Sequence, residues 1–446
     1  MKRKQLASLV LTAMISSAVL SACGSNNANN GNQASNANNA AATSEASAAP
    51  DTGKDSGKPV ELRIINWRVE DKAFFDQFNA KFEEENPNIK IRYDATPTQS
   101  YQQLKNSRIA ANEVDIVAGD YKTMNSADQR ELWMDLSGQS FLGNFKQDAL
   151  QNLNYDGKQY GLPWNKVSLV AYYNKKIFSD LGLQEPTTWT EFTALLDKIK
   201  GAGIDPILVG GKDGWPMQQI VHTLEPSIVR GAKPDFYGKD NANVMALTSK
   251  FTDPEWLEVF TKFQTLSKYF QKNSLGLAYG QAPGLFAQGK AAMTIDGTFS
   301  LTQINDAKPN FEVGTFIVPA TDDAAKNKIG YAKIGGAWFI ANNSPNKEAA
   351  LKYLEAFSQK DNYQLYIDTV NQFPVMDGIT MKDPLAQKIN DQLSAKDAVD
   401  QFTNIQNSGS TYQLDLLIKV ATGGMKPEDA AKQWQKDYED SKPNWK

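Results

Sequence analysis

One stretch of the chain, GLFAQGK, places two glycines and a lysine at the spacing of a phosphate-binding loop. Gly284, Gly289 and Lys290 match the pattern G-x-x-x-x-G-K-[ST], but Ala291 replaces the hydroxyl that would bind Mg²⁺. Such a loop also follows a strand and precedes a helix. Here we expect a helix that ends at Gly289, followed by a short buried strand, KAAMTID. We therefore interpret the stretch as structural and predict no nucleotide site.

The chain contains few residues that could support histidine or cysteine chemistry. His222 and Cys23 are the single residues of their types, so we predict no metal site of the usual His/Cys kind and no cofactor. A Ser-His nucleophile would have to use His222, and no G-x-S-x-G motif accompanies it. We expect His222 to lie on a helix, at the surface or in helix packing. A glycoside hydrolase needs only two carboxylates, and 51 acidic residues leave that alternative open.

The N-terminus has the pattern of a secretory signal. Three basic residues precede an uncharged run that ends in LSAC at Cys23, and the run is too short for a comfortable membrane span. LSAC is similar to a bacterial lipobox, which predicts a signal peptide over residues 1–22 and a lipoprotein anchored through lipidated Cys23, with palmitate among its lipids. Removing residues 1–22 takes three positive charges from a formal net charge of −4. The resulting acidic chain offers no nucleic-acid footprint.

Residues 23–57 are expected to form a disordered tether. After Cys23 they contain no apolar residue larger than alanine, so they cannot bury enough surface to offset the entropy of ordering. A flexible chain of this length reaches about 30–35 Å, which would hold a folded body just off a membrane.

The body, residues 58–446, alternates strand and helix patterns. VELRIINW alternates as a half-buried strand, and Phe74, Phe78 and Phe82 then form one helical stripe. TTWTEFTALLDKIKGAG combines a capping box, Thr188 and Glu191, with an apolar stripe. Later, SPNKEAALKYLEAF predicts a helix capped at its Ser-Pro start. This alternation favours an α/β fold with mostly parallel sheets, whose ligands bind at the carboxyl ends of strands.

Four stretches taken together resemble the extracytoplasmic solute-binding proteins of carbohydrate ABC importers, the family that includes maltose-binding protein. They are YGLPWNKVSLVAYYNKKIFSDLGL (160–183), TTWTEFTALLDKIKGAG, FAQGKAAMTIDGTF (286–299) and GGAWFIANNSPNKEAALKYLEAF (335–357). The lipobox, the tether and the C-terminal KPEDAAKQWQKDYED also fit.

The resemblance implies a two-lobe periplasmic-binding-protein fold with three interdomain crossings, at 160–183, 286–299 and 335–357. Lobe one would take residues 58–172 and 294–344, and lobe two residues 173–293 and 345–446. It further implies a monomer that binds an extracellular sugar or oligosaccharide between the lobes and delivers it to the permease subunits of an importer. The lobes would close around the ligand by a hinge motion.

Sugars present apolar C–H faces and many hydroxyls, so their sites combine flat aromatic side chains with carboxylates and amides. Side chains of these kinds near predicted strand ends give the candidate ligand-binding residues Trp67, Glu70, Asp71, Asp120, Tyr121, Trp164, Asn165, Asp213, Trp215, Asp296 and Trp338. Trp67, Trp164 and Trp338 also fit core positions, and Asp120 and Asp296 also fit capping roles. Trp215, in the polar loop GGKDGWP, has less reason to be buried.

Two other classes remain open at this point: a secreted glycoside hydrolase, and a surface sugar sensor or structural lipoprotein. The crossing pattern and lipid tether favour solute binding over both. Nothing in the sequence fixes which sugar binds. The overall acidity disfavours highly anionic sugars, although a few local lysines or arginines could reverse that. The remaining tryptophans, expected to be structural, are Trp133, Trp189, Trp256, Trp434 and Trp445.

Overall fold

The computed structural model describes residues 59–124, 126–232, 250–328, 330–394, 399–400 and 410–441. The chain divides into two units, Met1–Lys54 and Asp55–Lys446, and the account below concerns the second. The predicted signal peptide, Cys23, the tether and Trp445 lie outside the described residues. Among those described, no helix is both long and apolar enough to cross a bilayer.

One mixed sheet runs through the described part of the body, with its strands in the order β2-β1-β3-β10-β6-β8-β7. In addition, β11 pairs with β10 and β9 with β6, while β4 and β5 form a separate pair. The strands are β1 (Val60–Asn66), β2 (Ile89–Ala95), β3 (Ile116–Gly119), β4 (Asn154–Tyr155), β5 (Lys158–Gln159), β6 (Leu162–Asn174), β7 (Ile207–Leu208), β8 (Met293–Gly297), β9 (Val313–Phe316), β10 (Tyr331–Ile340) and β11 (Val399–Asp400).

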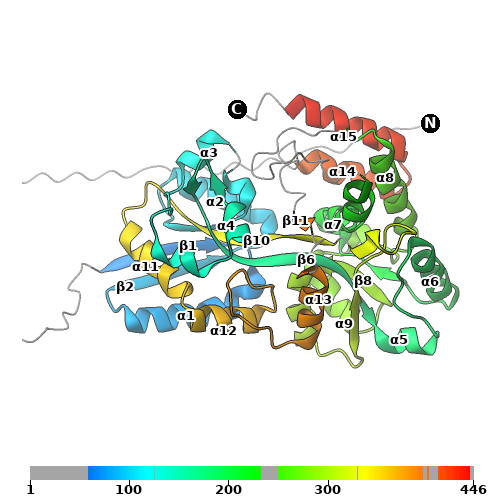
Figure 1. Ribbon diagram of the computed structural model, residues 1–446, viewed down its shortest axis with the longest axis horizontal. Coiled ribbons are helices and arrows are strands. Elements are labelled where there is room, and N and C mark those ends of the chain that lie inside the picture. Colours follow the sequence, from blue (N-terminus) through cyan, green and yellow to red (C-terminus); the bar gives the residue numbers. More distant parts are fainter. Residues whose placement is uncertain are drawn as a thin grey trace, which may run out of the picture. The chain divides into compact units, whose positions relative to one another are not determined.

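The middle of this sheet departs from the expectation of mostly parallel strands. The outer pairs β1–β2, β1–β3 and β7–β8 are parallel, but β10 runs antiparallel to both β3 and β6, and β6 runs antiparallel to β8 and β9. The reason is that β6 and β10 carry the chain across the middle of the sheet in opposite directions (Figure 1).

Helices cover the sheet on both sides of this middle. They are α1 (Lys72–Glu85), α2 (Thr98–Ala110), α3 (Ala127–Glu131), α4 (Gln147–Gln151), α5 (Lys175–Asp180), α6 (Trp189–Gly201), α7 (Trp215–Glu225), α8 (Pro254–Ser267), α9 (Ala282–Ala287), α10 (Leu301–Asp306), α11 (Lys347–Phe357), α12 (Lys360–Val370), α13 (Pro384–Ser394), α14 (Ser410–Ala421) and α15 (Pro427–Ser441). The predicted capping box of α6 is confirmed, because Thr188 accepts from the Glu191 N–H and Glu191 accepts from the Thr188 N–H.

The apolar side chains form two main cores. The first joins β1, β3, α1, α11 and α12, and the predicted stripe of Phe74, Phe78 and Phe82 lies in it. The second joins β7, β8, α6, α7, α8, α14 and α15. A smaller cluster under α9, α10 and α13 adjoins β6 and β7. Figure 1 shows β6 and β10 spanning the space between the α1–α12 group and the α7–α8 group.

The chain passes between these cores in β6, in β10 and in the segment that joins α12 to α13. The first predicted crossing, 160–183, contains β6 and agrees with this. The second, 286–299, is wrong as a crossing, since β8 pairs with β7 and β6 and its side chains stay with the second core. Gly289 does follow α9 with a positive φ of 72°, as expected of a helix-ending glycine.

The division of the chain between the cores also differs from the predicted one. The predicted boundary assigned everything after residue 344 to lobe two, yet Tyr353, Phe357 and Tyr366 of α11 and α12 pack in the first core. Their rings lie against the phenylalanine stripe of α1, at 5.1–6.3 Å between centroids for Phe74. Conversely, β8 and β9 belong with the second core. The apolar side of α11 had to pack against another apolar surface, and the sequence did not show which of the two cores provided that surface.

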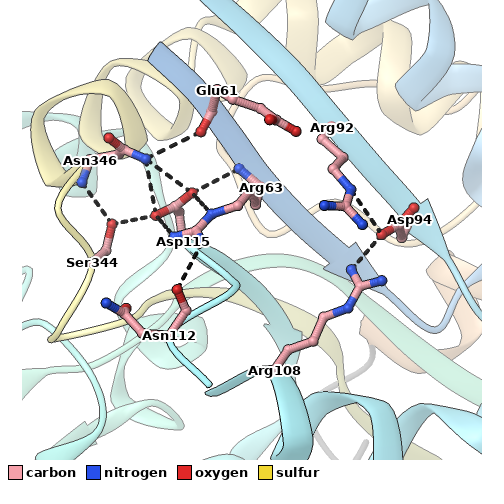
Figure 2. A network of polar contacts seen from close by, with 9 residues as sticks. All are labelled: Glu61, Arg63, Arg92, Asp94, Arg108, Asn112, Asp115, Ser344 and Asn346. Carbon is pink, nitrogen blue, oxygen red and sulfur yellow. Dashed lines mark hydrogen bonds and ion pairs between the residues drawn. The ribbon is translucent and has the colours of Figure 1, made fainter. Parts of the chain in front are cut away.

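A network of hydrogen bonds and ion pairs connects β1 and the start of β3 with the segment that leads from β10 into α11 (Figure 2). The fully buried carboxylate of Asp115 accepts from the Arg63 backbone N–H at 2.8 Å and from the Arg63 guanidinium at 2.9 Å. It also accepts from the Ser344 hydroxyl at 2.7 Å. The predicted Ser344-Pro345 helix cap is therefore wrong, since Asn346 occupies the N-cap of α11. Burial acts to raise the pKa of Asp115, but these hydrogen bonds outweigh it and hold the pKa below its ordinary value.

Candidate functional site

A cleft of about 500 Å³ opens between elements of the two cores. One wall comes from α2 and from the segments that follow β1 and β3, and the opposite wall comes from α7 and the neighbourhoods of Tyr279 and Phe299. The middles of β6 and β10 contribute Val167, Leu169 and Lys333 between the walls. The parallel pairing of β1 with β3 places their carboxyl ends together, so Trp67 and Asp120 line the same cleft.

One face of α2 forms much of the first wall. Thr98, Tyr101, Gln102 and Lys105 all line the cleft, and their spacing is the i, i+3, i+4, i+7 set of one helix face. Sequence analysis missed all four, because it searched strand ends. The signal was present as a polar and aromatic stripe in TQSYQQLK, where a stripe that packs into a core would be apolar.

Aromatic rings stand on both walls. On the first wall, Trp67 lies 5.5 Å from Tyr101 between ring centroids, tilted by 59°. On the second, Trp215 lies 4.2 Å from Tyr279 and 6.2 Å from Phe299. The Trp215 indole N–H is buried and has no hydrogen-bond partner in the described protein.

Local chain geometry explains the position of Trp215. Gly214, with a positive φ of 75°, turns the chain so that Trp215 opens α7. Asp213 accepts from the backbone N–H of Tyr279 at 2.7 Å, which ties the loop before α7 to the segment carrying the neighbouring ring. Asp213 therefore holds the two aromatic residues together and does not itself line the cleft.

A buried ion pair positions the arginine of the first wall. Arg68 donates to Asp71 through Nε at 2.6 Å and through a terminal nitrogen at 3.0 Å, and Glu70 lies 3.6 Å away. Tyr366 donates to Asp71 at 3.3 Å, and Asn165 donates to Tyr366 at 2.6 Å. Burial raises the pKa of Glu70, and the Arg68 charge opposes that rise. Arg68 and Glu70 face the cleft, whereas Asp71 and Asn165 support them from behind.

Further polar side chains come from α7 and α2. Gln218, Gln219 and His222 line the cleft from α7, and the Gln219 carbonyl oxygen has no partner in the described protein. His222 stacks on Tyr331 at 5.5 Å with the rings 8° from parallel, so it is a cleft residue as well as a helix-packing one. Burial lowers the pKa of Lys105, and the charge of Asp120 opposes that shift.

The structure brings only part of the predicted set to the cleft. Trp67, Glu70, Asp120 and Trp215 line it. The side chain of Tyr121 lies outside the described residues, although its backbone follows Asp120 directly.

The predicted ligand contacts Trp164 and Trp338 are core residues. Both are 0% exposed, and their rings lie 4.4 Å apart in the first core. A side chain at Gly336 would collide with the indole of Trp164, so the glycines of GGAW serve close packing. Four of the five other tryptophans are also structural as predicted: Trp133, Trp189, Trp256 and Trp434 pack in or against the two cores.

Asp296 is also buried away from the cleft lining. It lies in β8, one residue before the end of the strand, is 4% exposed and accepts from the Gly297 N–H at 2.7 Å. Burial raises its pKa to about 7, against the opposing effects of that N–H and of the hydroxyls of Ser300 and Tyr279. Asp296 therefore lies behind the Tyr279 side of the cleft. The described residues include no cluster of three or more His, Cys, Asp or Glu that could hold a metal ion.

Two cores that the described part of the chain joins through β6, through β10 and between α12 and α13, with an aromatic cleft between them, define the two-lobe class of periplasmic binding proteins. The chain belongs to the family described as bacterial extracellular solute-binding protein, whose model matches residues 66–364. Members of this family bind solutes and are not enzymes, so the hydrolase alternative is set aside, and the family places the protein outside the cytoplasm.

Named relatives and solved structures agree with this assignment. The chain is 27% identical over 311 residues to the multiple sugar-binding protein of Streptococcus mutans, covering 67% of this chain and 70% of that protein. It is 24% identical over 327 residues to the maltodextrin-binding protein MdxE of Bacillus subtilis, covering 70% and 73%. Among solved structures, a chitin oligosaccharide binding protein is 26% identical, with a TM-score of 0.76 over 86% of this chain and 99% of that one.

Proposed function

We propose that this protein captures an extracellular sugar or oligosaccharide in the cleft between its two lobes and delivers it to an ABC importer. The observation that carries the proposal is the pairing of aromatic rings on both walls with hydrogen-bonding side chains between them. Aromatic faces suit the C–H faces of a sugar, and amides, carboxylates and cations suit its hydroxyls.

The size and chemistry of the cleft suit a ligand of this kind. A volume of about 500 Å³ lies within the range of small-molecule sites. The indole N–H of Trp215 and the carbonyl oxygen of Gln219 are a buried donor and a buried acceptor without partners in the described protein. Such groups carry a desolvation cost, which a sugar hydroxyl would remove where closure of the lobes or rotation of the side chain brings it within reach. Relatives named for sugar binding support the same solute class.

The residues proposed to contact the ligand come from the first lobe and the second. From the sequence-based candidates we retain Trp67, Glu70, Asp120, Tyr121 and Trp215. We assign Asp71, Asn165 and Asp213 to positioning roles, since their hydrogen bonds hold neighbouring cleft residues. The α2 face adds Thr98, Tyr101, Gln102 and Lys105.

Ligand-driven closure of the lobes is part of this proposal. A ligand that touches both walls shifts an open–closed equilibrium toward the closed state. We expect the radius of gyration from small-angle scattering to fall when a binding sugar is added at saturation. An unchanged radius at saturation would contradict the hinge mechanism while leaving sugar binding itself intact.

The N-terminal segment completes the proposed function. We propose that residues 1–22 are a lipoprotein signal peptide, that Cys23 carries the lipid anchor and that residues up to 57 tether the body to the membrane. The body would then act as a monomer that meets the permease subunits of the importer. Support comes from the lipobox-like LSAC and the polar tract that follows it.

A panel titration tests the proposed function. The purified protein is titrated calorimetrically with neutral and acidic oligosaccharides of several linkage types, and each mixture is then examined chromatographically for shortened products. We expect saturable binding of at least one sugar without cleavage. Failure of every sugar to bind would refute the proposal. Release of shortened products would instead support the alternative function, that of a glycoside hydrolase.

A further inference from the structure

The most unusual group in the cleft is the ammonium of Lys105. Lys105 lies on α2, is 8% exposed and lines the cleft. Within the described residues, no hydrogen bond or ion pair reaches its side chain. Among the described residues, the charge of Asp120 opposes the lowering of the Lys105 pKa by burial, without an ion pair between the two side chains. Most of the Lys105 side chain is therefore buried at the wall of the cleft, and its ammonium has no contacting partner among the described residues.

Arg68, another cation of the same cleft, makes the contrast plain. Its guanidinium is held by Asp71 through two hydrogen bonds, and Glu70 lies 3.6 Å away. These acids raise the pKa of Arg68 although burial alone would lower it. Its charge is thus met within the protein. Among the described residues, no acidic side chain contacts the Lys105 ammonium in this way. A molecule bound in the cleft would supply the missing partner.

The chemistry of an ammonium decides which ligand group suits it. An ammonium offers three donors and no acceptor, and burying it unpaired is costly. A sugar hydroxyl would supply one neutral acceptor, whereas a carboxylate supplies two oxygens and the opposite charge. Hydrogen bonds between charged partners are about twice as strong as neutral ones. Thr98 and Gln102 on the same helix face remain for the uncharged hydroxyls.

We propose that the cleft binds a sugar that carries a carboxylate, that is, a uronosyl unit, and that Lys105 binds this carboxylate. The inference rests on the proposed function and names the substrate class of that site. It reverses the expectation drawn from overall acidity, because the local charge at one wall governs recognition where the ligand is desolvated. Asp120 also lines the cleft, and we propose that its carboxylate accepts from a hydroxyl of the same ligand.

Matched pairs of oligosaccharides test the inference. Glucuronosyl, galacturonosyl and mannuronosyl oligosaccharides are each titrated calorimetrically beside the neutral counterpart in which CH₂OH replaces the carboxylate. The protein is compared with Lys105→Met, which keeps the length of the side chain without its charge, and with Lys105→Arg, which keeps the charge. Lys72→Met is the control, because Lys72 lies on α1 with 54% of its side chain exposed and outside the cleft lining.

We expect one acidic sugar to bind roughly 10- to 100-fold more tightly than its neutral counterpart. Lys105→Met should abolish that preference without lowering the melting temperature, since the ammonium makes no hydrogen bond or ion pair with the described residues. Lys105→Arg should retain part of the preference, and Lys72→Met all of it. Equal or tighter binding of the neutral members overturns the inference and leaves sugar binding standing, as does unchanged acid affinity in Lys105→Met. If no member of any pair binds, the result contradicts both the proposed function and this inference.

Discussion

Substitution of Trp215 distinguishes most clearly between two roles for this residue: stacking on the ligand and packing in the core. Its ring lines the cleft and is partly exposed, with Tyr279 at 4.2 Å and Phe299 at 6.2 Å as its aromatic neighbours. Trp256, by contrast, is 0% exposed in the second core. Truncation of Trp215 to alanine should therefore cost more in binding than a core truncation does, and less in folding.

The magnitudes follow from these contacts. A ring that stacks on a sugar contributes on the order of 1–2 kcal/mol, so Trp215→Ala should weaken binding roughly 5- to 30-fold. Loss of its contacts with Tyr279 and Phe299 should cost about 1–2 kcal/mol of stability. A fully buried tryptophan would cost about 3–5 kcal/mol. Trp215→Phe keeps a ring but removes the unpaired indole N–H, and so separates stacking from hydrogen bonding.

The assay combines calorimetric titration with thermal unfolding for each variant, using the tightest-binding oligosaccharide of the panel. Trp189→Ala serves as the control, because Trp189 packs against the second core and does not line the cleft. It should lower the melting temperature and leave affinity unchanged. A large fall in melting temperature for Trp215→Ala, with unchanged affinity in the folded fraction, would refute the stacking argument.

Three further outcomes are expected. Asp115→Ala should remove about 2–4 kcal/mol of stability in denaturant unfolding, because it leaves Arg63 and Ser344 without their buried acceptor; a loss below 1 kcal/mol would contradict the role given to this network. The pKa of Asp296, raised by burial to about 7 against an ordinary value near 4, makes its contribution to stability complete below pH 4 and lost as pH rises to about 7. Asp296→Asn should therefore remove up to about 4 kcal/mol of pH dependence in that window, and an identical stability profile in both proteins would show that the carboxylate is ionised throughout. Cys23→Ser should release the protein from membranes in detergent partitioning, and unchanged partitioning would contradict the lipid anchor.

Local patterns in the sequence predicted much of the fold. The phenylalanine stripe of α1 and the capping box of α6 depend on residues close together in the chain, so their spacing alone defined the helices. The same holds for α9, which ends at Ala287 and is followed by Gly289 with the positive φ expected of a helix-ending glycine. The search of strand ends selected Trp67 and Asp120, which line the cleft because parallel strands bring their carboxyl ends to one edge.

Long-range packing decided the rest. Trp164 and Trp338 have the residue type and strand position of ligand contacts, yet they face the first core, since a strand end does not reveal which side of the sheet a side chain occupies. The allocation of α11 to the first core depended on its partner face on α1. Lys105 looked like any helical lysine in the sequence. Only the position of α2 beside the cleft buried most of its side chain without supplying a partner among the described residues, and burial of that kind is a property of the assembled fold.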